Sequence, residues 1–363
     1  MQIGIVGAGI MGRLLAFLLI EAGHVVSLFD QGNEHTRDTC SFTAAGLLTP
    51  LSELDKADKL IYQLGSEALQ MHWPRIIHTI NQNIYFQIQG SIILSHPKDT
   101  IALKHYISLI QHKMNDTFMY QQLDHQALLM LEPQLSKFDT AYFFLEEGQL
   151  DSQAVMSALQ IYCEENHITW YKNTFVSAVL PHTICTSSKH YEFDIVIDCC
   201  GMGAKKSWID LQGVRGELIW LQAPSVDIKR PIRFIHPRYS LYVVPRPNNI
   251  YLVGATEIYS EDISNVSVKS ALELLTMAYY LHSGFSEANI INMAAQCRPT
   301  LLNHLPKIKY ADGLIAVNGL YRHGFLISPT LAVDILRGIK QWQSNDLSDL
   351  SSFLHYPRLW ERI

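Results

Sequence analysis

Three glycines near the start of the chain have the spacing that binds the phosphates of a dinucleotide. Gly7, Gly9 and Gly12 form a G-x-G-x-x-G motif, and Asp30 follows eighteen residues after the last of them. In such a motif the first glycine permits a tight turn, the second lets the backbone approach the pyrophosphate, and the third lets a helix pack closely on a strand. The acid then lies where it can accept a hydrogen bond from a ribose hydroxyl. These residues predict dinucleotide binding.

The motif works only between a strand and a helix, and the sequence supplies both. The apolar residues 3–6 lead into the glycines, residues 14–20 favour a helix, and residues 25–29 form a second apolar run that ends at Asp30. Without these flanks three glycines would equally be a plain turn, and the flanks favour the nucleotide site. Nothing in this segment alone distinguishes NAD from FAD.

The composition excludes several classes of protein. The chain has 363 residues, of which 48% are hydrophobic and 17% charged, so it can bury a large core and is too long for one ordinary domain. Its formal net charge of -6 offers no surface for a polyanion, so nucleic acid is not an expected partner. The sixteen histidines show no H-E-x-x-H or comparable spacing, so no metal site is expected.

The cysteines favour reduced thiols, and the apolar runs favour neither export nor a membrane span. Six cysteines occur without a C-x-x-C pair, and Cys199 is adjacent to Cys200, which disfavours a disulfide framework. The apolar residues 14–20 end at Glu21 without a small-residue cleavage site. No run approaches the roughly twenty apolar residues that a membrane span needs. We expect a cytoplasmic protein without a membrane span.

The rest of the chain predicts a second strand end near the nucleotide and a change to antiparallel strands after residue 212. An apolar strand precedes Gly201, so two strand ends are expected to approach one nucleotide. Residues 55–73 predict a helix that Pro74 ends or kinks. Antiparallel segments follow from residue 213, with a hairpin at Asn248-Asn249. Further helices are expected at residues 268–281 and 328–342, and strands returning to the first sheet at 168–171, 175–179 and 193–198.

Several stretches together resemble the FAD-dependent D-amino-acid oxidase superfamily, and within it the glycine oxidases of thiazole (thiamine) biosynthesis. Each stretch is weak alone, but the order and separation of the set are specific, and the resemblance covers most of the chain. Besides the glycine motif, the stretches are TAAGLL (43–48), EGQLD (147–151), GVRGE (213–217), YVVPR (242–246), VGAT (253–256), RP (298–299) and GLYRHGFLISP (319–329).

The resemblance implies an α/β fold in which a Rossmann-like, discontinuous FAD-binding domain carries an inserted antiparallel-sheet α+β substrate domain. The FAD-binding domain would comprise residues 1–81, 150–212 and 295–363, and the substrate domain residues 82–149 and 213–294. The resemblance also favours FAD over NAD. The residues that it implies as FAD contacts are Gly7, Gly9, Ile10, Met11, Gly12, Asp30, Thr43, Ala44, Ala45, Gly46, Leu47, Val176, Gly201, Arg322, Gly324, Phe325 and Leu326.

Three residues match the family's substrate site. Arg298 resembles the arginine that grips the substrate carboxylate through two parallel hydrogen bonds, Tyr242 the tyrosine that adds a hydroxyl contact, and Arg322 a second arginine near flavin and substrate. Each also has a purely structural interpretation, as a salt bridge, a packing residue and a loop residue respectively. In sarcosine-oxidase relatives a cysteine near the carboxyl-terminal motif carries the flavin, and the nearest cysteine here is Cys297.

The resemblance implies oxidation of glycine or another small amino acid. The flavin takes a hydride from the α-carbon, an imine forms, and O2 is reduced to H2O2. The imine hydrolyses or passes to thiazole synthase, and relatives suggest a homo-oligomer. Two alternatives stay open, a D-amino-acid or sarcosine-type dehydrogenase with another electron acceptor and a non-catalytic flavoprotein. The exact substrate depends on side chains that the sequence does not place, such as Leu47, Leu48 and Tyr239.

Overall fold

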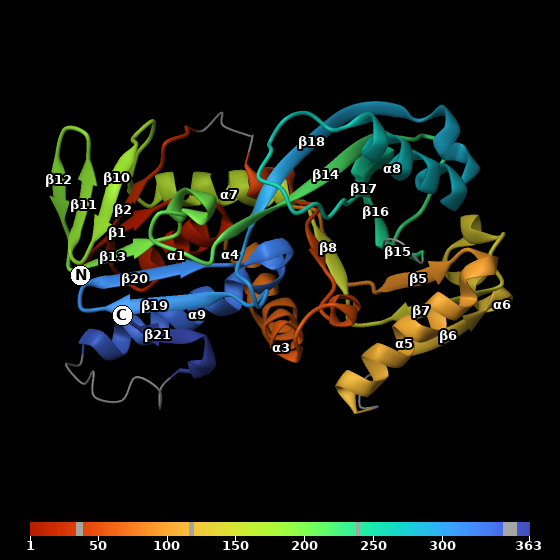
Figure 1. The fold of residues 1–363 in the computed structure, drawn as a ribbon, viewed down its shortest axis with the longest axis horizontal. Coiled ribbons are helices and arrows are strands. Elements are labelled where there is room, and N and C mark those ends of the chain that lie inside the picture. The colour runs from red at the N-terminus through yellow and green to blue at the C-terminus, as the bar shows by residue number, and fades with distance from the viewer. Residues whose placement is uncertain (34–38, 81, 116–119, 237–239, 344–353) are drawn as a thin grey trace.

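Two large sheets divide the molecule into two halves (Figure 1). The structure is a computed structural model that describes residues 1–33, 39–80, 82–115, 120–236, 240–343 and 354–363. Both chain termini lie in the half that holds the first sheet, and two long strands, β14 (Gln212–Gln222) and β18 (Asn289–Thr300), extend toward the other half (Figure 1). The expected α/β fold is confirmed.

The first sheet is built around the strand that precedes the glycine motif. Its central strand β1 pairs in parallel with β2 on one side and β13 on the other. Ile3 and Ile5 in β1 are fully buried, as expected for a parallel strand that is covered on both faces. The strand order is β21 (Trp360–Arg362), β19 (Lys307–Ala311), β20 (Leu314–Asn318), β13 (Ile195–Asp198), β1 (Gln2–Val6), β2 (Val25–Phe29) and β9 (Thr169–Tyr171).

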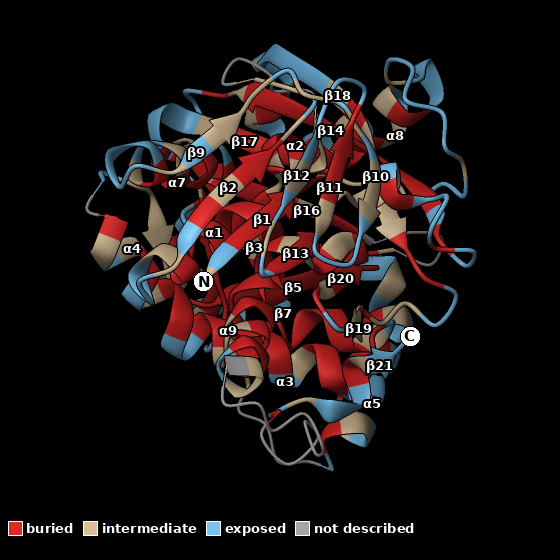
Figure 2. Ribbon diagram, turned by 90° about the vertical axis from the view of Figure 1, so that its left-hand side faces the viewer, coloured by how far each residue is buried: buried red, intermediate tan, exposed pale blue. Residues whose placement is uncertain are grey.

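Helices cover one face of the first sheet, and a small antiparallel sheet covers the other. Leu14 and Ile335 belong to the core on the helical face, whereas Ile184 packs against Phe29 on the opposite face. Figure 2 shows β1 and β13 largely buried and the small sheet more exposed. The elements of the two layers are α1 (Ile10–Glu21), α7 (Ser152–Glu165) and α9 (Gly324–Gln343), and β10 (Val176–Leu180), β11 (Thr183–Thr186) and β12 (His190–Glu192).

The small sheet corrects one expectation. Residues 175–179 do not return to the first sheet, because β10 pairs with β11 and lies across that sheet as a cover. The predicted strands at 168–171 and 193–198 do join the first sheet, as β9 and β13.

The second sheet is antiparallel except for the pair β5–β15, which is parallel. Helices lie on both of its faces: α8 packs in the core of Phe234 and Val243, and α5 in the core of Ile93 and Ile235. β18 crosses the domain boundary expected at residues 294–295. The strand order is β18, β14, β17 (Ile250–Gly254), β16 (Ser240–Arg246), β15 (Ile232–Ile235), β5 (Ser91–Ser95), β7 (Thr140–Phe144) and β6 (Tyr120–Asp124), and the helices are α5 (Thr100–Met114), α6 (His125–Leu131) and α8 (Val268–Leu281).

Pro74 does not end the helix in which it lies, so the expectation of a helix end at this residue was wrong. The segment runs as α3 (Lys59–Glu67), a π-helical turn (Ala68–His72) and α4 (Trp73–Ile80). Pro74 is the second residue of α4 and follows the π-helical turn directly. Such a change in the backbone hydrogen-bond pattern accommodates a residue that has no N–H donor. The short elements between the halves are α2 (Cys40–Thr43), a 3-10 turn (Ser52–Asp55), and the strands β3 (Leu47–Leu48), β8 (Gly148–Leu150) and β4 (Phe86–Gln87).

None of the helices in the described ranges has both the length and the apolar character that a bilayer crossing requires.

Candidate active site

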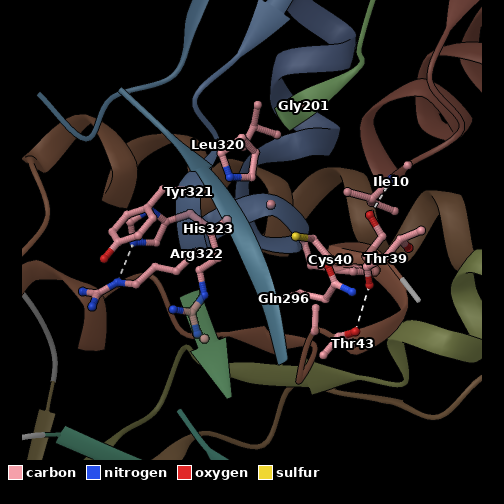
Figure 3. Close-up of a pocket in the computed structure, with 18 of the residues that line it drawn as sticks. Ile10, Thr39, Cys40, Thr43, Gly201, Gln296, Leu320, Tyr321, Arg322 and His323 are labelled. Carbon is pink, nitrogen blue, oxygen red and sulfur yellow. Dashed lines mark hydrogen bonds between the residues drawn. The ribbon is translucent and has the colours of Figure 1, made fainter. Parts of the chain in front are cut away.

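A single cavity of about 760 Å³ joins the glycine motif to the end of β18. Its wall takes residues from both large sheets, from α2 and from the 3-10 turn Tyr321–His323 that precedes α9. Figure 3 shows Thr39 and Cys40 at one side of the cavity and Arg322 at the other, with Gln296 between them. The fold therefore places the predicted nucleotide site and the predicted substrate site in one continuous space.

The three glycines of the motif have different structural causes. Gly7 has a φ of +99°, and a Cβ there would lie 2.6 Å from the carbonyl oxygen of Cys199. A Cβ on Gly12 would lie 1.9 Å from the carbonyl oxygen of Gly7, so only glycine lets α1 approach β1. A Cβ on Gly9 would meet only Ser41 Oγ, at 3.4 Å. Gly9 lines the cavity, so the absence of a side chain there leaves room for a ligand. The packing of the described residues does not itself require a glycine at this position.

The amino terminus of α1 is open to the cavity. Gly9 caps the helix without a side-chain hydrogen bond, although Ser41 Oγ accepts one from the backbone of Ile10 at 3.0 Å. Such a helix end favours an anionic group. The Asp30 carboxylate accepts hydrogen bonds from the backbone N–H groups of Ala8 and Gly32, both at 2.7 Å, and also lines the cavity. Its contact with a ribose stays a prediction.

Arg246 fixes the small-residue segment that passes beside the cavity. It donates hydrogen bonds to the carbonyl oxygens of Ala45 and Leu150 and to Oε1 of Gln149. Burial lowers the pKa of Arg246 to about 10, so the side chain stays charged at neutral pH. Gly46 in this segment has a φ of +66°, and a Cβ there would lie 2.1 Å from the Leu150 oxygen. The segment is therefore held by a residue of the second sheet.

Most residues expected to contact FAD line this cavity. Gly12 lies below the turn, and Val176 packs beside Val6 and Phe29 instead. Leu48 is buried behind the wall, and Tyr239 falls outside the described residues. The expected contacts that do line the cavity are Gly7, Gly9, Ile10, Met11, Asp30, Thr43, Ala44, Ala45, Gly46, Leu47, Gly201, Arg322, Gly324, Phe325 and Leu326.

Arg298 presents an unpaired guanidinium to the cavity. Its side chain lies over Gly216 of the neighbouring strand β14, where a Cβ would fall 2.0 Å from Nη2. Nη1 donates a hydrogen bond to the carbonyl oxygen of Thr256 at 3.0 Å. Within the described part of the chain, no carboxylate lies within ion-pair distance of Arg298. Its other N–H donors can therefore bind an anion that enters from outside.

The hydroxyl of Tyr242 is a second open donor. Tyr242 lies in β16, and its Oη would be 3.1 Å from a Cβ on Gly254. It has no hydrogen-bond partner among the residues that the structure describes. Burial raises the pKa of Tyr242 above its usual value, although nearby Arg298 acts in the opposite direction. The hydroxyl thus stays protonated and can donate.

The family of the chain follows from comparison with known proteins. A family model described as "FAD dependent oxidoreductase" (DAO) matches residues 2–335. The chain belongs to this family. The resemblance stated from the sequence is confirmed, and FAD is the cofactor of the DAO family.

Three relatives show how closely the chain matches other proteins. A protein of Rhizobium etli that carries the name of a candidate thiamine biosynthesis oxidoreductase, ThiO, is 30% identical over 338 residues, which cover 93% of this chain and 96% of the relative. The crystal structure of glycine oxidase from Geobacillus kaustophilus has a TM-score of 0.80 at 22% identity and covers 93% of this chain and 94% of its own. Iminodiacetate oxidase from Chelativorans sp. BNC1 has a TM-score of 0.82 at 19% identity and covers 99% of each chain. The chain is an FAD-dependent oxidoreductase with the fold of these enzymes.

The residues of the cavity fit FAD. The uncapped end of α1 and the bare Gly9 suit a pyrophosphate. Thr49 also lines the cavity, and its Oγ1 is buried without a partner among the described residues, as expected for a polar atom that a cofactor or substrate satisfies. When bound, FAD supplies the hydride acceptor that the side chains lack. Over the described ranges no three His, Cys, Asp or Glu side chains are grouped to hold a metal ion.

Arg322, unlike Arg298, already has acidic partners. Its Nε lies 2.7 Å from Oε2 of Glu53, and its Nη1 lies 3.4 Å from Oε2 of Glu257. Lys56 also pairs with Glu257, at 3.0 Å, and its side chain is half exposed. Burial acts to raise the pKa of Glu257, but the hydrogen bond from Tyr321 and the pairing with Lys56 hold it below its usual value. The carboxylates are therefore ionised beside Arg322.

Sequence reasoning missed four charged residues of this cavity: two glutamates, one lysine and one arginine. Glu53, Lys56, Arg233 and Glu257 all line the cavity, and none lies in a spacing typical of a site. One signal was present, because Arg233 lies in the otherwise apolar run of β15 (Ile232–Ile235) and is buried there. A buried charge in a strand requires a partner.

The thiol of Cys297 does not face the cavity. Side chains alternate between the faces of β18, so Gln296 and Arg298 share a face, and the Arg298 guanidinium lies over Gly216 in the cavity wall. The Cys297 thiol instead lies near the carbonyl oxygens of Ser260 and Asp262, at 3.5 and 3.7 Å. This orientation disfavours a covalent bond between Cys297 and the flavin.

Proposed function

We propose that the protein oxidatively deaminates glycine or another small amino acid, with transfer of a hydride from the α-carbon to FAD and release of an imine. O2 then takes the electrons and is reduced to H2O2. The observation that carries the proposal is the unpaired guanidinium of Arg298 in the cavity that also holds the dinucleotide motif. A structural flavin alone would not need an open arginine at that place.

Arg298 and Tyr242 bind the substrate carboxylate in this proposal. The guanidinium can donate two parallel hydrogen bonds, and the Tyr242 hydroxyl can add a third. A carboxylate fixed by three donors leaves few orientations for the α-carbon, which supports positioning as the main contribution of the protein. The substrate amine loses its proton before the reaction, so no side chain has to act as a general base.

The role in thiamine synthesis rests on the name of the Rhizobium etli relative. We propose that the imine hydrolyses to the 2-oxo acid or is taken up by thiazole synthase, and that the protein works as a homo-oligomer. A small polar substrate is consistent with the polar side chains that line the same cavity as Arg298, namely Tyr242, Glu257 and Arg322.

The test is an anaerobic flavin-bleaching screen with glycine, sarcosine, D-alanine and D-proline, followed by admission of air. Bleaching by glycine with rapid recovery and peroxide is the expected result. Bleaching only by larger D-amino acids, or bleaching without recovery in air, would favour a dehydrogenase that uses another acceptor. The absence of bleaching by every compound would overturn the proposal and favour a non-catalytic flavoprotein.

A further inference from the structure

Glu53 is the acceptor on which three side chains from two distant segments converge. Arg322 Nε lies 2.7 Å from Oε2, and His323 Nε2 lies 3.1 Å from the same oxygen. Arg233 of β15 pairs with the other oxygen, Oε1. Glu53 itself belongs to the 3-10 turn after β3, so its carboxylate links this turn to the second sheet and to the turn before α9.

The charge state of this cluster is set by its surroundings. Burial acts to raise the pKa of Glu53, but the guanidinium groups of Arg322 and Arg233 hold it well below its usual range. Burial lowers the pKa of His323, whose hydrogen bond to Glu53 acts in the opposite direction. At neutral pH the Glu53 carboxylate therefore faces two guanidinium groups and a neutral imidazole.

We infer that Glu53 is a positioning residue that keeps Arg322 and Arg233 from binding the substrate carboxylate, so that Arg298 is the one arginine that receives it. The inference rests on the proposed carboxylate site. Arg233, Arg298 and Arg322 all line one cavity. A carboxylate that could choose among them would bind in several orientations, and only one orientation would present the α-carbon correctly. Glu53 removes that choice.

The second acid of the cavity strengthens this arrangement without replacing it. Glu257 lies 3.4 Å from Arg322 and also pairs with Lys56 and accepts a hydrogen bond from Tyr321 at 2.7 Å. Arg233, by contrast, has no ion pair besides that with Glu53 in the described part of the chain. Loss of the Glu53 charge should therefore remove the ion pair of Arg233 and one of the two ion pairs of Arg322.

The experiment measures binding of acetate, a carboxylate without an amine, to the FAD-loaded protein by isothermal titration calorimetry. As single substitutions, Arg298→Ala should raise the dissociation constant of acetate by at least about tenfold, whereas Arg322→Gln should change it by less than about threefold. Glu53→Gln should instead bind acetate about tenfold more tightly and at the same time show a kcat for the amino acid that is at least about tenfold lower.

Tighter binding with slower turnover separates the inference from a merely structural role, since a damaged site would lose both. The double variant Glu53→Gln/Arg322→Gln should lose part of the gained affinity, because Arg322 supplies part of it. Glu132→Gln is the matched control: Glu132 is equally buried and paired with Arg230 at 3.1 Å, but does not line the cavity. It should leave the acetate affinity unchanged.

Unchanged or weaker acetate binding in Glu53→Gln would overturn the inference. If that variant does not fold, the Arg322→Gln measurement decides, and a loss of acetate affinity as large as that of Arg298→Ala would overturn the inference too. A failure of Arg298→Ala to weaken acetate would instead contradict the proposed carboxylate site itself, so the two failures are distinguishable.

Discussion

Two arginines of one cavity differ in the partners that the fold gives them. Arg322 is neutralised by Glu53 and Glu257, whereas among the described residues Arg298 donates only to the neutral carbonyl oxygen of Thr256. A buried or half-buried guanidinium without an acid is costly unless an anion binds it. Arg298 is thus suited to bind a substrate, whereas Arg322 is suited to hold the site together.

Replacement of Arg298 should abolish substrate recognition and spare the flavin. Arg298→Lys keeps the charge but not the two parallel hydrogen bonds, and Arg298→Ala removes both. Hydrogen bonds to charged groups contribute about 1.5–3 kcal/mol each, so the alanine variant should raise the KM for the amino acid at least about 100-fold. The KM of the lysine variant should lie between those of the wild type and the alanine variant. Steady-state kinetics with the flavin absorbance as a control tests this, and an unchanged KM in the alanine variant would exclude the assignment.

Gly216→Ala should weaken substrate binding because it displaces Arg298, and not because it destabilises the fold. The added Cβ would lie 2.0 Å from Nη2 and 2.2 Å from Cζ of Arg298, and the guanidinium is the movable end of a flexible chain. We expect a KM raised by about tenfold or more with little loss of thermal stability. The control is Gly216→Ala in the Arg298→Ala background, where it should have no further effect on KM. An equal effect in both backgrounds would contradict the mechanism.

At the scale of elements, the 3-10 turn Ser52–Asp55 is the part that carries Glu53 into the cavity. Glu147 fixes this turn from behind, since its carboxylate accepts hydrogen bonds from the backbone N–H and the hydroxyl of Ser52, at 2.6 and 2.7 Å, and from the hydroxyl of Ser91. Burial raises the pKa of Glu147 from 4.5 to about 7, against the hydrogen bonds from both serines and the charge of Arg233.

The stability of the protein should therefore contain a term that depends on Glu147. Because the folded pKa lies above the unfolded one, this term is fully present below pH 4.5 and is lost as the pH rises through about 7. The shift corresponds to about 3 kcal/mol. Glu147→Gln cannot ionise, so its free energy of unfolding relative to wild type should rise by about that amount between pH 5 and 8. Urea unfolding at both pH values checks this.

The control for that comparison is Glu146→Gln, which removes the same charge from an exposed neighbour. It should follow the wild-type pH dependence in the same pH range. A Glu147→Gln curve parallel to the wild-type curve would show that Glu147 is not protonated in the folded protein.

What the sequence predicted and what it missed differ in the distance between the residues involved. The strand, turn and helix around Gly7 are one local segment, and Arg298 lies in a local motif, so both could be located. Glu53, in contrast, has its partners Arg233 and His323 at separations of 180 and 270 residues. Such pairs arise only when the two sheets are assembled. The helix end expected at Pro74 was wrong for a related reason, because the adjoining π-helical turn is not visible in the composition.

At the scale of the whole molecule, the cavity is a joint between the two sheets. The nucleotide motif belongs to the first sheet, Arg298 and Tyr242 belong to the second, and the turn before α9 faces both. Arg246 and Glu53 bind the halves together across this space. A ligand that extends through the cavity should thus stabilise both halves, and a shorter ligand only one.

Hydrogen exchange on the flavin-free protein tests this division. ADP matches the part of FAD that the glycine motif binds, so it should slow exchange at the amino terminus of α1 and leave β18 and the turn Tyr321–His323 unchanged. FAD should protect all three segments, by about 2.7 kcal/mol at a hundredfold excess over its dissociation constant. Both ligands are compared at the same multiple of their dissociation constants, which removes affinity as a cause. Equal protection of β18 by ADP would mean that the halves are coupled through the protein alone and that the flavin ring is not needed to join them.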